Sequence, residues 1–497
     1  MTEKRSRDSA VSSTGDIWSS DEFQEYGDWI LNWISHYFSN PQEYPVLAKV
    51  QPGEIRKRLP QHPPNRSEPM ENVWSDFQSV ILPGITHWNH PGFMAYFGIT
   101  GSQPGILAET LSAALNVNGM LWKASPAATE LEEVTLDWLR QLLGLPSRFW
   151  GVIQDTASLS SLVAMIAARQ TIPGVRDEGL CGRSDLPPLR YYISQEAHSS
   201  IEKAGIVLGI GRKGVCSIPS DKNFRMDTRL LEKSIRADLD QGIRPFAVVA
   251  TAGTTSTTSV DPLDRIAEIC RRYKLWFHVD AAYAGAAALL PEKRELFKGW
   301  ERADSIVVNP HKWLFCPIDL SVLYCRKPQV IREALSLVPA YLETPEADEV
   351  VNFMDYGVAL GRRFRSLKLW FVLRTFGREG LQTRLQEHIR LAQQFSRWVG
   401  RSTLFRRMAP TPFSTVCFRL EPRSLKATPH KMTPATLDKL NETLLRNVNA
   451  SGEIFISSTR LRGRTILRLA IGNIRTDERY LRRTCEILEA EAKRLLK

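Results

Sequence analysis

The feature that most constrains the fold is an alternation of short apolar runs and amphipathic segments between about residues 100 and 330. In its clearest stretch, a β-rich run at 246–250 is followed by a helical pattern that opens at Pro262 and by a second apolar run at 275–279. Strands that alternate with helices in this way pack into an open sheet with helices on its faces. The sequence therefore predicts an α/β fold.

Polar residues follow two of the apolar runs at the point where each run ends. Asp280 comes directly after the run at 275–279, and the segment 309–312 (Asn-Pro-His-Lys) follows a run at 305–308. Open α/β sheets bind their ligands at the carboxyl ends of the strands. The sequence therefore predicts a ligand site that contains Asp280 and the segment 309–312.

Lys312 lies in an apolar stretch, between the run at 305–308 and the aromatic residues Trp313 and Phe315. A lysine removed from water has a lowered pKa and is prepared to attack a carbonyl group. Such a lysine can hold pyridoxal 5′-phosphate (PLP) as a Schiff base. A buried lysine that only pairs with a carboxylate is the structural alternative, and the local sequence leaves both open.

Asp280 favours the chemical interpretation of Lys312. A PLP-bearing lysine needs a carboxylate partner that keeps the pyridine nitrogen protonated and the ring an electron sink. Ala282, on the same side of an extended chain, is small enough for the ring to lie flat beside it. Asp280 could instead be a helix N-cap, but Asp280 and Lys312 together are more specific than either residue alone.

A phosphate-binding turn is indicated at Thr156, Ala157 and Ser158. These residues follow an apolar run and open a helical one, so hydroxyls and free backbone N–H groups meet at a helix N-terminus. Neither a Walker nor a Rossmann glycine pattern stands where a phosphate loop is needed. The alternative is that the Ser and Thr are ordinary helix caps.

Two further polar residues are candidates for the same site. Thr255 follows a strand and a glycine turn, so it is a candidate polar contact. His198 could stack on the cofactor ring and touch the substrate carboxylate, although a lone histidine is more often structural. Both interpretations depend on the other parts of the site being present.

The rest of the chain is expected to add a helical N-terminal segment and a small C-terminal α/β domain. A capping-box pattern at Ser19 and Glu22 opens a helix that ends near Asn40. The predicted domains are a disordered tail at 1–16, an N-terminal segment at 17–100, a large domain at 101–385 and a small domain at 386–497. The other predicted elements are an extended connector at 60–69, a helix at about 358–399, strands at 413–420 and 465–471, and a closing helix at 477–496.

Charge and cysteine content narrow the function classes. The 497-residue chain has a net charge of +11, but its basic residues are scattered in short groups without a nucleic-acid-binding signature, so no nucleic-acid partner is expected. Its seven cysteines never occur in CxxC spacing, which indicates neither a disulfide framework nor a metal site. No membrane span and no secretory signal are expected, and the chain is predicted to be cytoplasmic.

At these residues the chain resembles the group II PLP-dependent decarboxylases, and most of all the aromatic-L-amino-acid decarboxylases. The resemblance runs from about Asp21 to Lys497. Its strongest blocks lie at 90–97, at 124–132 (Ala-Ser-Pro-Ala-Ala-Thr-Glu-Leu-Glu), around Asp280, at 309–313 (Asn-Pro-His-Lys-Trp) and at 361–368 (Gly-Arg-Arg-Phe-Arg-Ser-Leu-Lys).

The resemblance implies the PLP-dependent transferase fold of the aspartate-aminotransferase type (fold type I), with a large mixed-sheet domain and a small C-terminal α/β domain. It also implies an obligate homodimer whose N-terminal segment wraps the partner. Lys312 then carries the PLP Schiff base, Asp280 pairs with the pyridine nitrogen, and Ala282 and His198 lie on opposite ring faces. The residues at or beside family cofactor-contact positions are Thr156, Ala157, Ser158, His198, Thr255, Asp280, Ala282, Asn309, His311 and Lys312.

The family's mobile catalytic loop corresponds to the stretch around Tyr341. A phenol positioned there by loop closure can donate a proton to Cα after CO₂ has left. Relatives that convert the amino acid oxidatively to an aldehyde often carry Phe at this position, or Asn at the position of His198. Because this chain has Tyr341 and His198, the resemblance favours decarboxylation, with Lys312, Tyr341 and His198 as the catalytic residues.

The substrate side of the site matches Trp88, Tyr96, Phe97 and Gly361, which implies an aromatic pocket. Tryptophan, 5-hydroxytryptophan, DOPA, tyrosine and phenylalanine all remain open as substrates. The alternatives are an aromatic aldehyde synthase, a decarboxylase of an acidic amino acid such as glutamate, and a catalytically silent relative that only binds. An acidic substrate would need a cation facing its side chain, whereas the pocket segments are mainly apolar and aromatic.

Overall fold

The structure is a computed structural model that describes residues 17–337, 346, 349–422 and 433–497. Its internal contacts divide the chain into two units, Met1–His90 and Pro91–Lys497. This division falls before the predicted boundary at residue 100. Residues Phe93–Met94 belong to the second unit because they form a strand in one of its sheets.

The first unit is helical and is held together by aromatic side chains. Helix α1 spans Ser20–Ser39, and its predicted capping box is confirmed: Glu22 N donates to Ser19 Oγ, and Ser19 N donates to the Glu22 carboxylate. Trp33 stacks on Tyr37 with ring centroids 5.2 Å apart. The described part of this unit also contains helices α2 (Glu54–Arg58) and α3 (Met70–Asp76), short 3₁₀ helices at Pro41–Glu43 and Leu82–Gly84, and a π-helix at Phe77–Ile81.

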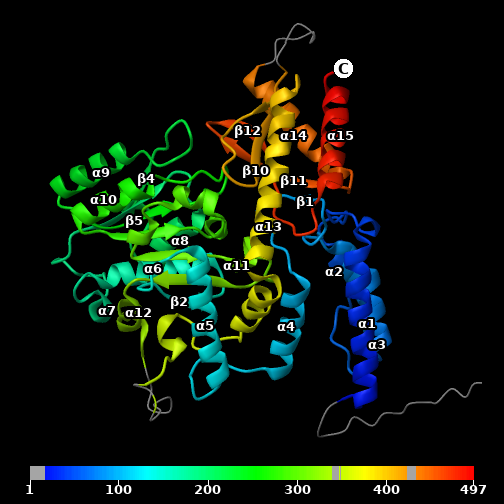
Figure 1. The fold of residues 1–497 in the computed structure, drawn as a ribbon, viewed down its shortest axis with the longest axis horizontal. Helices are drawn as coiled ribbons and strands as arrows, with labels where there is room; N and C mark the ends of the chain where they lie inside the picture. The colour runs from blue at the N-terminus through cyan, green and yellow to red at the C-terminus, as the bar shows by residue number, and fades with distance from the viewer. Residues whose placement is uncertain (1–16, 338–345, 347–348, 423–432) are drawn as a thin grey trace, which may run out of the picture. The chain divides into compact units, whose positions relative to one another are not determined.

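A seven-stranded mixed sheet forms the centre of the second unit (Figure 1). Strand β8 runs antiparallel to both of its neighbours, β2 and β7, and the remaining pairs are parallel. The strands, in order across the sheet, are β2 (Trp150–Gln154), β8 (Ser321–Cys325), β7 (Ser305–Val308), β6 (Trp276–Asp280), β5 (Arg244–Thr251), β3 (Leu189–Ser194) and β4 (Val215–Ile218). The predicted runs at 246–250, 275–279 and 305–308 are thus confirmed as strands.

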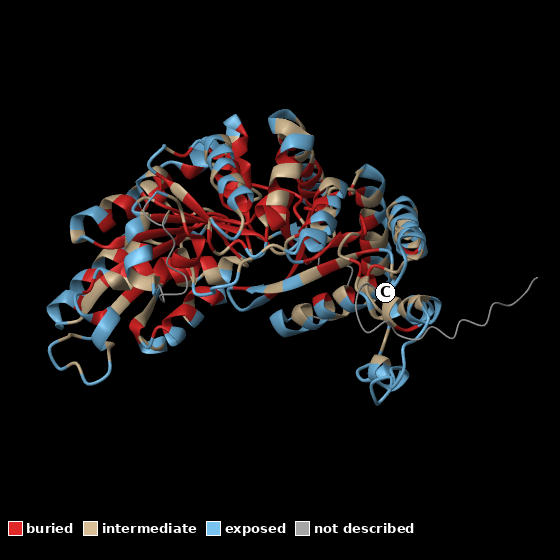
Figure 2. Ribbon diagram, turned by 90° about the horizontal axis from the view of Figure 1, so that it is seen from below, coloured by how far each residue is buried: buried red, intermediate tan, exposed pale blue. Residues whose placement is uncertain are grey.

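Helices cover both faces of this sheet, and the strands between them are buried on both sides (Figure 2). Neighbouring residues of one strand face opposite layers, as Val248 and Val249 of β5 do. One layer contains residues of α5 (Pro126–Leu143), α9 (Thr228–Asp240), α10 (Leu263–Tyr273) and α13 (Ser366–Arg401); the other contains residues of α6 (Ala157–Gln170), α8 (Ser199–Val207) and α12 (Pro328–Leu335). Also in this unit are α4 (Gln103–Leu115), α7 (Val175–Glu178) and α11 (Pro310–Trp313).

A second sheet of five strands has its own core. Its strands, in order, are β1 (Phe93–Met94), β11 (Phe455–Leu461), β12 (Arg464–Ala470), β10 (Thr415–Leu420) and β9 (Phe405–Arg407). The core contains residues of α13 and of the helices α14 (Pro434–Ala450) and α15 (Glu478–Leu495). The predicted C-terminal strands and closing helix are confirmed, whereas the pairing of β1 with β11 was not foreseen.

The expected helix at 358–399 is wrong at its start, because α13 begins only at Ser366. The backbone before it is committed to other partners: Arg362 N donates to Asn118 Oδ1, and Arg362 O accepts from Gly119 N at 2.8 Å. The single N–H of Arg362 is therefore not available for a helical hydrogen bond. The predicted small-domain boundary at residue 386 lies inside α13.

Among the described residues, no helix combines the length and apolarity needed to cross a lipid bilayer.

Candidate active site

The ends of β6 and β7 bring Asp280 and the segment after Val308 together. The two strands are parallel, with Asp280 opposite Val307, and Ala281 N donates to Val307 O at 3.0 Å. Asn309 N donates to Ala282 O at 3.1 Å, which ties the two loops beyond the strands to each other. The predicted neighbourhood of Asp280 and the segment 309–312 is therefore present.

Lys312 lies in the short helix α11 and is partly buried. Its Nζ is 5.3 Å from the centroid of the Phe97 ring. Burial lowers the pKa of Lys312; the carboxylate of Asp280 opposes this shift, and the guanidinium of Arg468 adds to it. A lysine with a lowered pKa holds more of its amine in the neutral, nucleophilic form.

Asp280 is buried, and one of its oxygens accepts a hydrogen bond from Ala282 N at 3.1 Å. The next helical turn, Ala284–Leu289, begins only after Tyr283, so Asp280 does not cap it. This excludes the N-cap alternative for Asp280. Ala282 is also buried, and its methyl group presents little bulk beside the carboxylate.

The side chains of Asn309 and His311 define a buried hydrogen-bond donor. Leu320 N donates to His311 Nδ1 at 2.9 Å, and burial lowers the pKa of His311 to about 3, so the ring is neutral with its proton on Nε2. Nε2 lies 3.2 Å from the Asn309 amide and requires its oxygen as acceptor. The structure draws Nδ2 toward His311 and leaves Oδ1 in a buried position without a partner among the described residues; exchanging the two amide atoms satisfies both groups and turns Nδ2 to that position.

An orphaned buried donor at this position fits an anionic group such as a phosphate. The start of α6 offers matching donors, because Thr156 stands at its N-cap position without any hydrogen bond from its side chain to the helix. The N–H groups of Ala157 and Ser158 therefore keep the anion-binding character of a helix N-terminus. The residues present fit the phosphate of PLP.

His198 and Thr255 line one cavity of about 610 Å³. Ser200 N donates to His198 Nδ1 at 3.2 Å, so the neutral ring carries its proton on Nε2. Partial burial lowers the pKa of His198, opposed by Asp280 and assisted by Lys312 and Lys203. His198 thus caps α8, as the structural alternative expects, and still has a ring N–H that can donate to a carboxylate.

The residues predicted for substrate binding fall into different parts of the chain. Phe97 stacks on Tyr283 with ring centroids 3.9 Å apart and lies near Lys312. Tyr96 is exposed, and a Cβ added at Gly361 would lie 3.8 Å from Asn118 Nδ2. Trp88 belongs to the first unit. Tyr341 lies outside the described residues.

Arg468 was not recognised in the sequence. It is buried in β12, its guanidinium lies 4.4 Å from the Phe97 ring centroid, and it donates to Ser256 O at 3.0 Å and to Tyr96 O. It therefore ties the Thr255 loop to the Phe97 segment. Apart from an arginine in an apolar strand, nothing in the sequence marked it.

Apart from Gly361, the segment 361–368 was identified only as a family block, and the contacts of its arginines were not foreseen. Arg362 forms an ion pair with the buried Glu132 at 2.7 Å and donates to Ile153 O at 2.9 Å. Arg365 forms ion pairs with Asp155 and Asp319. Arg362 thus holds the end of β2, and Arg365 places a positive charge beside Asp155, just before the Thr156 turn.

No group of three or more His, Cys, Asp or Glu side chains that could hold a metal ion occurs in the part of the chain that the structure describes.

Comparison with known proteins places this site in a family. The pyridoxal-dependent decarboxylase conserved domain matches residues 52–421. The chain is 40% identical over 487 residues to phenylacetaldehyde synthase of Arabidopsis thaliana, covering 96% of this chain and 97% of the relative. It is 38% identical to tryptophan decarboxylase 2 of Oryza sativa subsp. japonica, with 96% of each chain covered.

Solved structures agree with this placement. The crystal structure of Oryza sativa TDC with PLP and tryptamine has a TM-score of 0.93 at 35% identity, covering 97% of this chain and all of the other. That of Catharanthus roseus tryptophan decarboxylase in complex with L-tryptophan has a TM-score of 0.90 at 36% identity, with 97% and 100% covered. They confirm the predicted fold class, fold type I, and PLP as cofactor. The chain belongs to the pyridoxal-dependent decarboxylase family.

Proposed function

We propose that the protein decarboxylates an aromatic L-amino acid to the corresponding arylalkylamine and CO₂, with PLP held at Lys312. The observation that carries the proposal is the desolvated Lys312, which has Asp280 as its carboxylate partner and the Phe97 ring 5.3 Å away. The similarity to tryptophan and tyrosine decarboxylases over 96% of the chain supports it.

The proposed cofactor site combines residues from five loops. Thr156, Ala157, Ser158 and the freed amide of Asn309 receive the phosphate, Asp280 pairs with the pyridine nitrogen, and Ala282 and His198 lie on the two ring faces. Thr255 and His311 complete the surroundings. When bound, PLP supplies an electron sink for the negative charge that remains at Cα after the carboxylate departs.

The chain's own groups have distinct tasks in the proposed reaction. Burial lowers the pKa of Lys312, which increases the share of its amine that is neutral and able to form a covalent bond or accept a proton. His198 Nε2–H can orient the substrate carboxylate, since Nδ1 is occupied by Ser200. Tyr341, assigned from the family resemblance, donates the proton to Cα.

The substrate side of the site favours an aromatic group over an acidic one. Phe97 and Tyr283 present stacked rings beside Lys312. Arg468 also lies over Phe97; its Nε and Nη1 donate to the carbonyl oxygens of Ser256 and Tyr96, and its Nη2 is buried without a partner among the described residues. Trp88, Tyr96 and Gly361 remain proposed substrate contacts.

A second candidate function is the oxidative conversion to an aldehyde. It is favoured by the 40% identity to phenylacetaldehyde synthase, which is of the same order as the identity to the decarboxylases. The presence of Tyr341 and His198 speaks for the decarboxylase.

The test is to incubate PLP-loaded protein with aromatic and acidic L-amino acids and to measure CO₂, amine, aldehyde and ammonia together. We expect amine and CO₂ in equal amounts from an aromatic substrate. Lys312→Ala should abolish both turnover and the absorbance of lysine-bound cofactor, and Tyr341→Phe should divert product from amine to aldehyde. Aldehyde and ammonia from the wild type would establish the oxidative reaction instead, and wild-type turnover by Lys312→Ala would refute the site.

We further infer a homodimer in the cytoplasm. The dimer follows from the family resemblance, and it agrees with the exposed Leu107, Leu111 and Leu115, which lie on one side of α4. The cytoplasmic location is supported by seven cysteines that are all free thiols.

A further inference from the structure

We propose that Arg365 is a positioning residue for the cofactor phosphate: it neutralises Asp155, the carboxylate that directly precedes the Thr156 turn. The inference rests on the proposed function, because it requires that the turn at 156–158 receives the phosphate of PLP. It assigns a task to two charged residues that do not contact the reacting atoms.

The geometry places one guanidinium between two carboxylates. Arg365 Nη2 lies 2.8 Å from Asp155 Oδ1, and Arg365 Nε donates to Asp319 Oδ1 at 2.7 Å. The Arg365 side chain is 12% exposed, whereas that of Asp155 is 46% exposed. Arg365 is therefore fixed from the Asp319 side and contacts the more exposed Asp155.

Asp319 is the anchor of this arrangement. Its burial would raise the pKa of its carboxyl, but the hydrogen bond and charge of Arg365, together with Lys368, lower the pKa below its ordinary value. Asp319 is thus held ionised and keeps Arg365 oriented. Because Arg365 precedes α13 directly, its backbone position is also set by that helix.

Asp155 would work against phosphate binding if it stood alone. The N-terminus of α6 attracts an anion through its free N–H groups and its dipole. An unpaired carboxylate on the residue before Thr156 would repel the phosphate, because both groups are negatively charged. Pairing with Arg365 removes this repulsion.

Arg365 is not needed to hold the end of β2 in place, because other contacts do so. Gln154 Nε2 donates to Tyr356 O at 2.8 Å, and Arg362 donates to Ile153 O at 2.9 Å, so the end of β2 is held without Arg365. Asp155 is half exposed, so its ion pair contributes little to folding. The role that remains for the Arg365–Asp155 pair is electrostatic.

The experiment measures the dissociation constants of apoenzyme variants for PLP and for pyridoxal, which lacks the phosphate, by absorbance titration at low and high salt. We expect Arg365→Gln to raise Kd for PLP about fivefold or more at low salt, and Kd for pyridoxal less than about twofold. Arg365→Gln combined with Asp155→Asn should recover most of the loss, and Arg365→Lys should retain most of the affinity. Arg363→Gln is the matched control, because Arg363 is exposed and pairs with Glu109 instead.

Equal loss of affinity for PLP and pyridoxal in Arg365→Gln, or no recovery of PLP affinity in the double variant, would overturn the inference.

If Arg365→Gln fails to fold, the Asp155→Asn variant alone tests the inference. It should increase the preference for PLP over pyridoxal, since it removes the negative charge beside the Thr156 turn while Asp319 still holds Arg365, and a decreased preference contradicts the proposal. If the wild type itself does not distinguish PLP from pyridoxal, the proposed phosphate turn is wrong. If the wild type prefers PLP and Arg365→Gln has the same dissociation constants for PLP and pyridoxal, the phosphate turn stands and only the role of Arg365 is refuted.

Discussion

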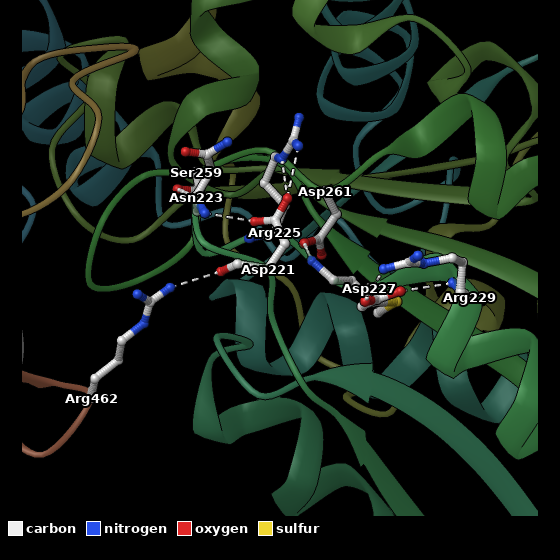
Figure 3. A network of polar contacts seen from close by, with 9 residues as sticks. Asp221, Asn223, Arg225, Asp227, Arg229, Ser259, Asp261 and Arg462 are labelled. Atoms are coloured by element: carbon white, nitrogen blue, oxygen red, sulfur yellow. Dashed lines mark hydrogen bonds and ion pairs between the residues drawn. The ribbon is translucent and has the colours of Figure 1, made fainter.

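Two ionisable groups near the sheet, the partly buried Lys312 and the buried Asp261, lie in different electrostatic environments. Lys312 loses water but has the carboxylate of Asp280 nearby, whereas Asp261 loses water and accepts hydrogen bonds only from backbone N–H groups. Figure 3 shows Asp261 beside the turn that contains Asp221, Asn223 and Arg225. Met226 N and Thr251 N donate to its two oxygens at 2.7 and 2.8 Å. Asp261 thereby fixes the end of β5, from which the Thr255 loop departs.

Asp261 gives the folding stability a pH dependence. Burial raises its pKa to about 7, the two N–H donors oppose this, and Glu196 and Asp221 add to it. The folded protein therefore keeps a proton that the unfolded chain has already lost above its ordinary pKa. Stability falls as the pH rises from about 4 to about 7 and stays reduced above that.

We predict that the wild type has a larger free energy of unfolding than Asp261→Asn at pH 5. This difference should decrease by up to about 3 kcal/mol between pH 5 and pH 8. At pH 5 the variant is less stable than the wild type. The NH₂ group of its side-chain amide faces one of the two backbone N–H groups, so two donors meet and no hydrogen bond forms there. Denaturant midpoints at the two pH values measure the difference. The exposed Asp240→Asn is the control, and an advantage that is constant with pH would mean that Asp261 is ionised throughout.

At the residue scale, the sequence identified groups whose chemistry depends on their nearest neighbours in the chain. Asp280 and Lys312 follow apolar strands, so their burial could be expected from the local pattern. Arg468 and Arg365 could not be assigned in this way, because their partners, Ser256 and Asp155, are distant in sequence. A surface arginine and a buried arginine look alike until the fold supplies the carboxylate or carbonyl that each one contacts.

At the scale of elements, the loop between β5 and α10 depends on close packing at Gly253. This residue has a φ of +93°, and a Cβ added there would lie 2.5 Å from the Ala284 side chain. The loop carries Thr255 and Ser256 into the cavity lined by His198. A side chain at Gly253 would therefore strain the backbone and displace the loop at the same time.

Gly253→Ala should destabilise the protein by roughly 2–3 kcal/mol and weaken PLP binding. Gly242→Ala is a matched control, since Gly242 has a φ of +72° but nothing within 4 Å of the added Cβ. It should cost only about 1 kcal/mol and leave PLP binding unchanged. Equal denaturant midpoints for the two variants would show that the contact with Ala284 is easily relieved.

Helices and strands with a clear period were predicted correctly, and α13 shows where this reasoning ends. The sequence predicts a helix from about residue 358. It begins later because the backbone of Arg362 forms hydrogen bonds with Asn118 and Gly119. Periodicity records which side chains could share a helix face. It carries no information about long-range hydrogen bonds that take the backbone away from the helix.

At the scale of the whole molecule, α4 presents an apolar stripe. Leu107, Leu111 and Leu115 are 51%, 47% and 62% exposed. The proposed homodimer would bury this stripe against the partner. We expect Leu111→Arg to shift the protein toward the monomer in sedimentation velocity, because an unpaired charge would enter an apolar interface. Leu239→Arg on α9 is the control at a similarly exposed leucine, and an unchanged dimer in Leu111→Arg would exclude α4 from the interface.

The overall α/β architecture could be predicted because it follows from local alternation, while the composition of the second sheet could not. Strand β1 has only two residues, and it pairs in parallel with β11 through Phe93 and Phe455. So short a run has no period of its own. Its place in the sheet is determined by the partner strand and not by any pattern around residue 93.

The pairing of β1 with β11 also sets the order in which a newly synthesised chain can mature. The ribosome makes Phe93 early and Phe455 close to the end, and Arg468, which donates to Tyr96 O, comes later still. The contacts of Arg468 with Tyr96 and with the Phe97 ring, which lies beside Lys312, therefore cannot form on a partly translated chain. We therefore expect the complete cofactor site to form only after translation has ended. A chain that terminates before β11 would lack the contacts of Arg468 around Phe97 even if the seven-stranded sheet has formed.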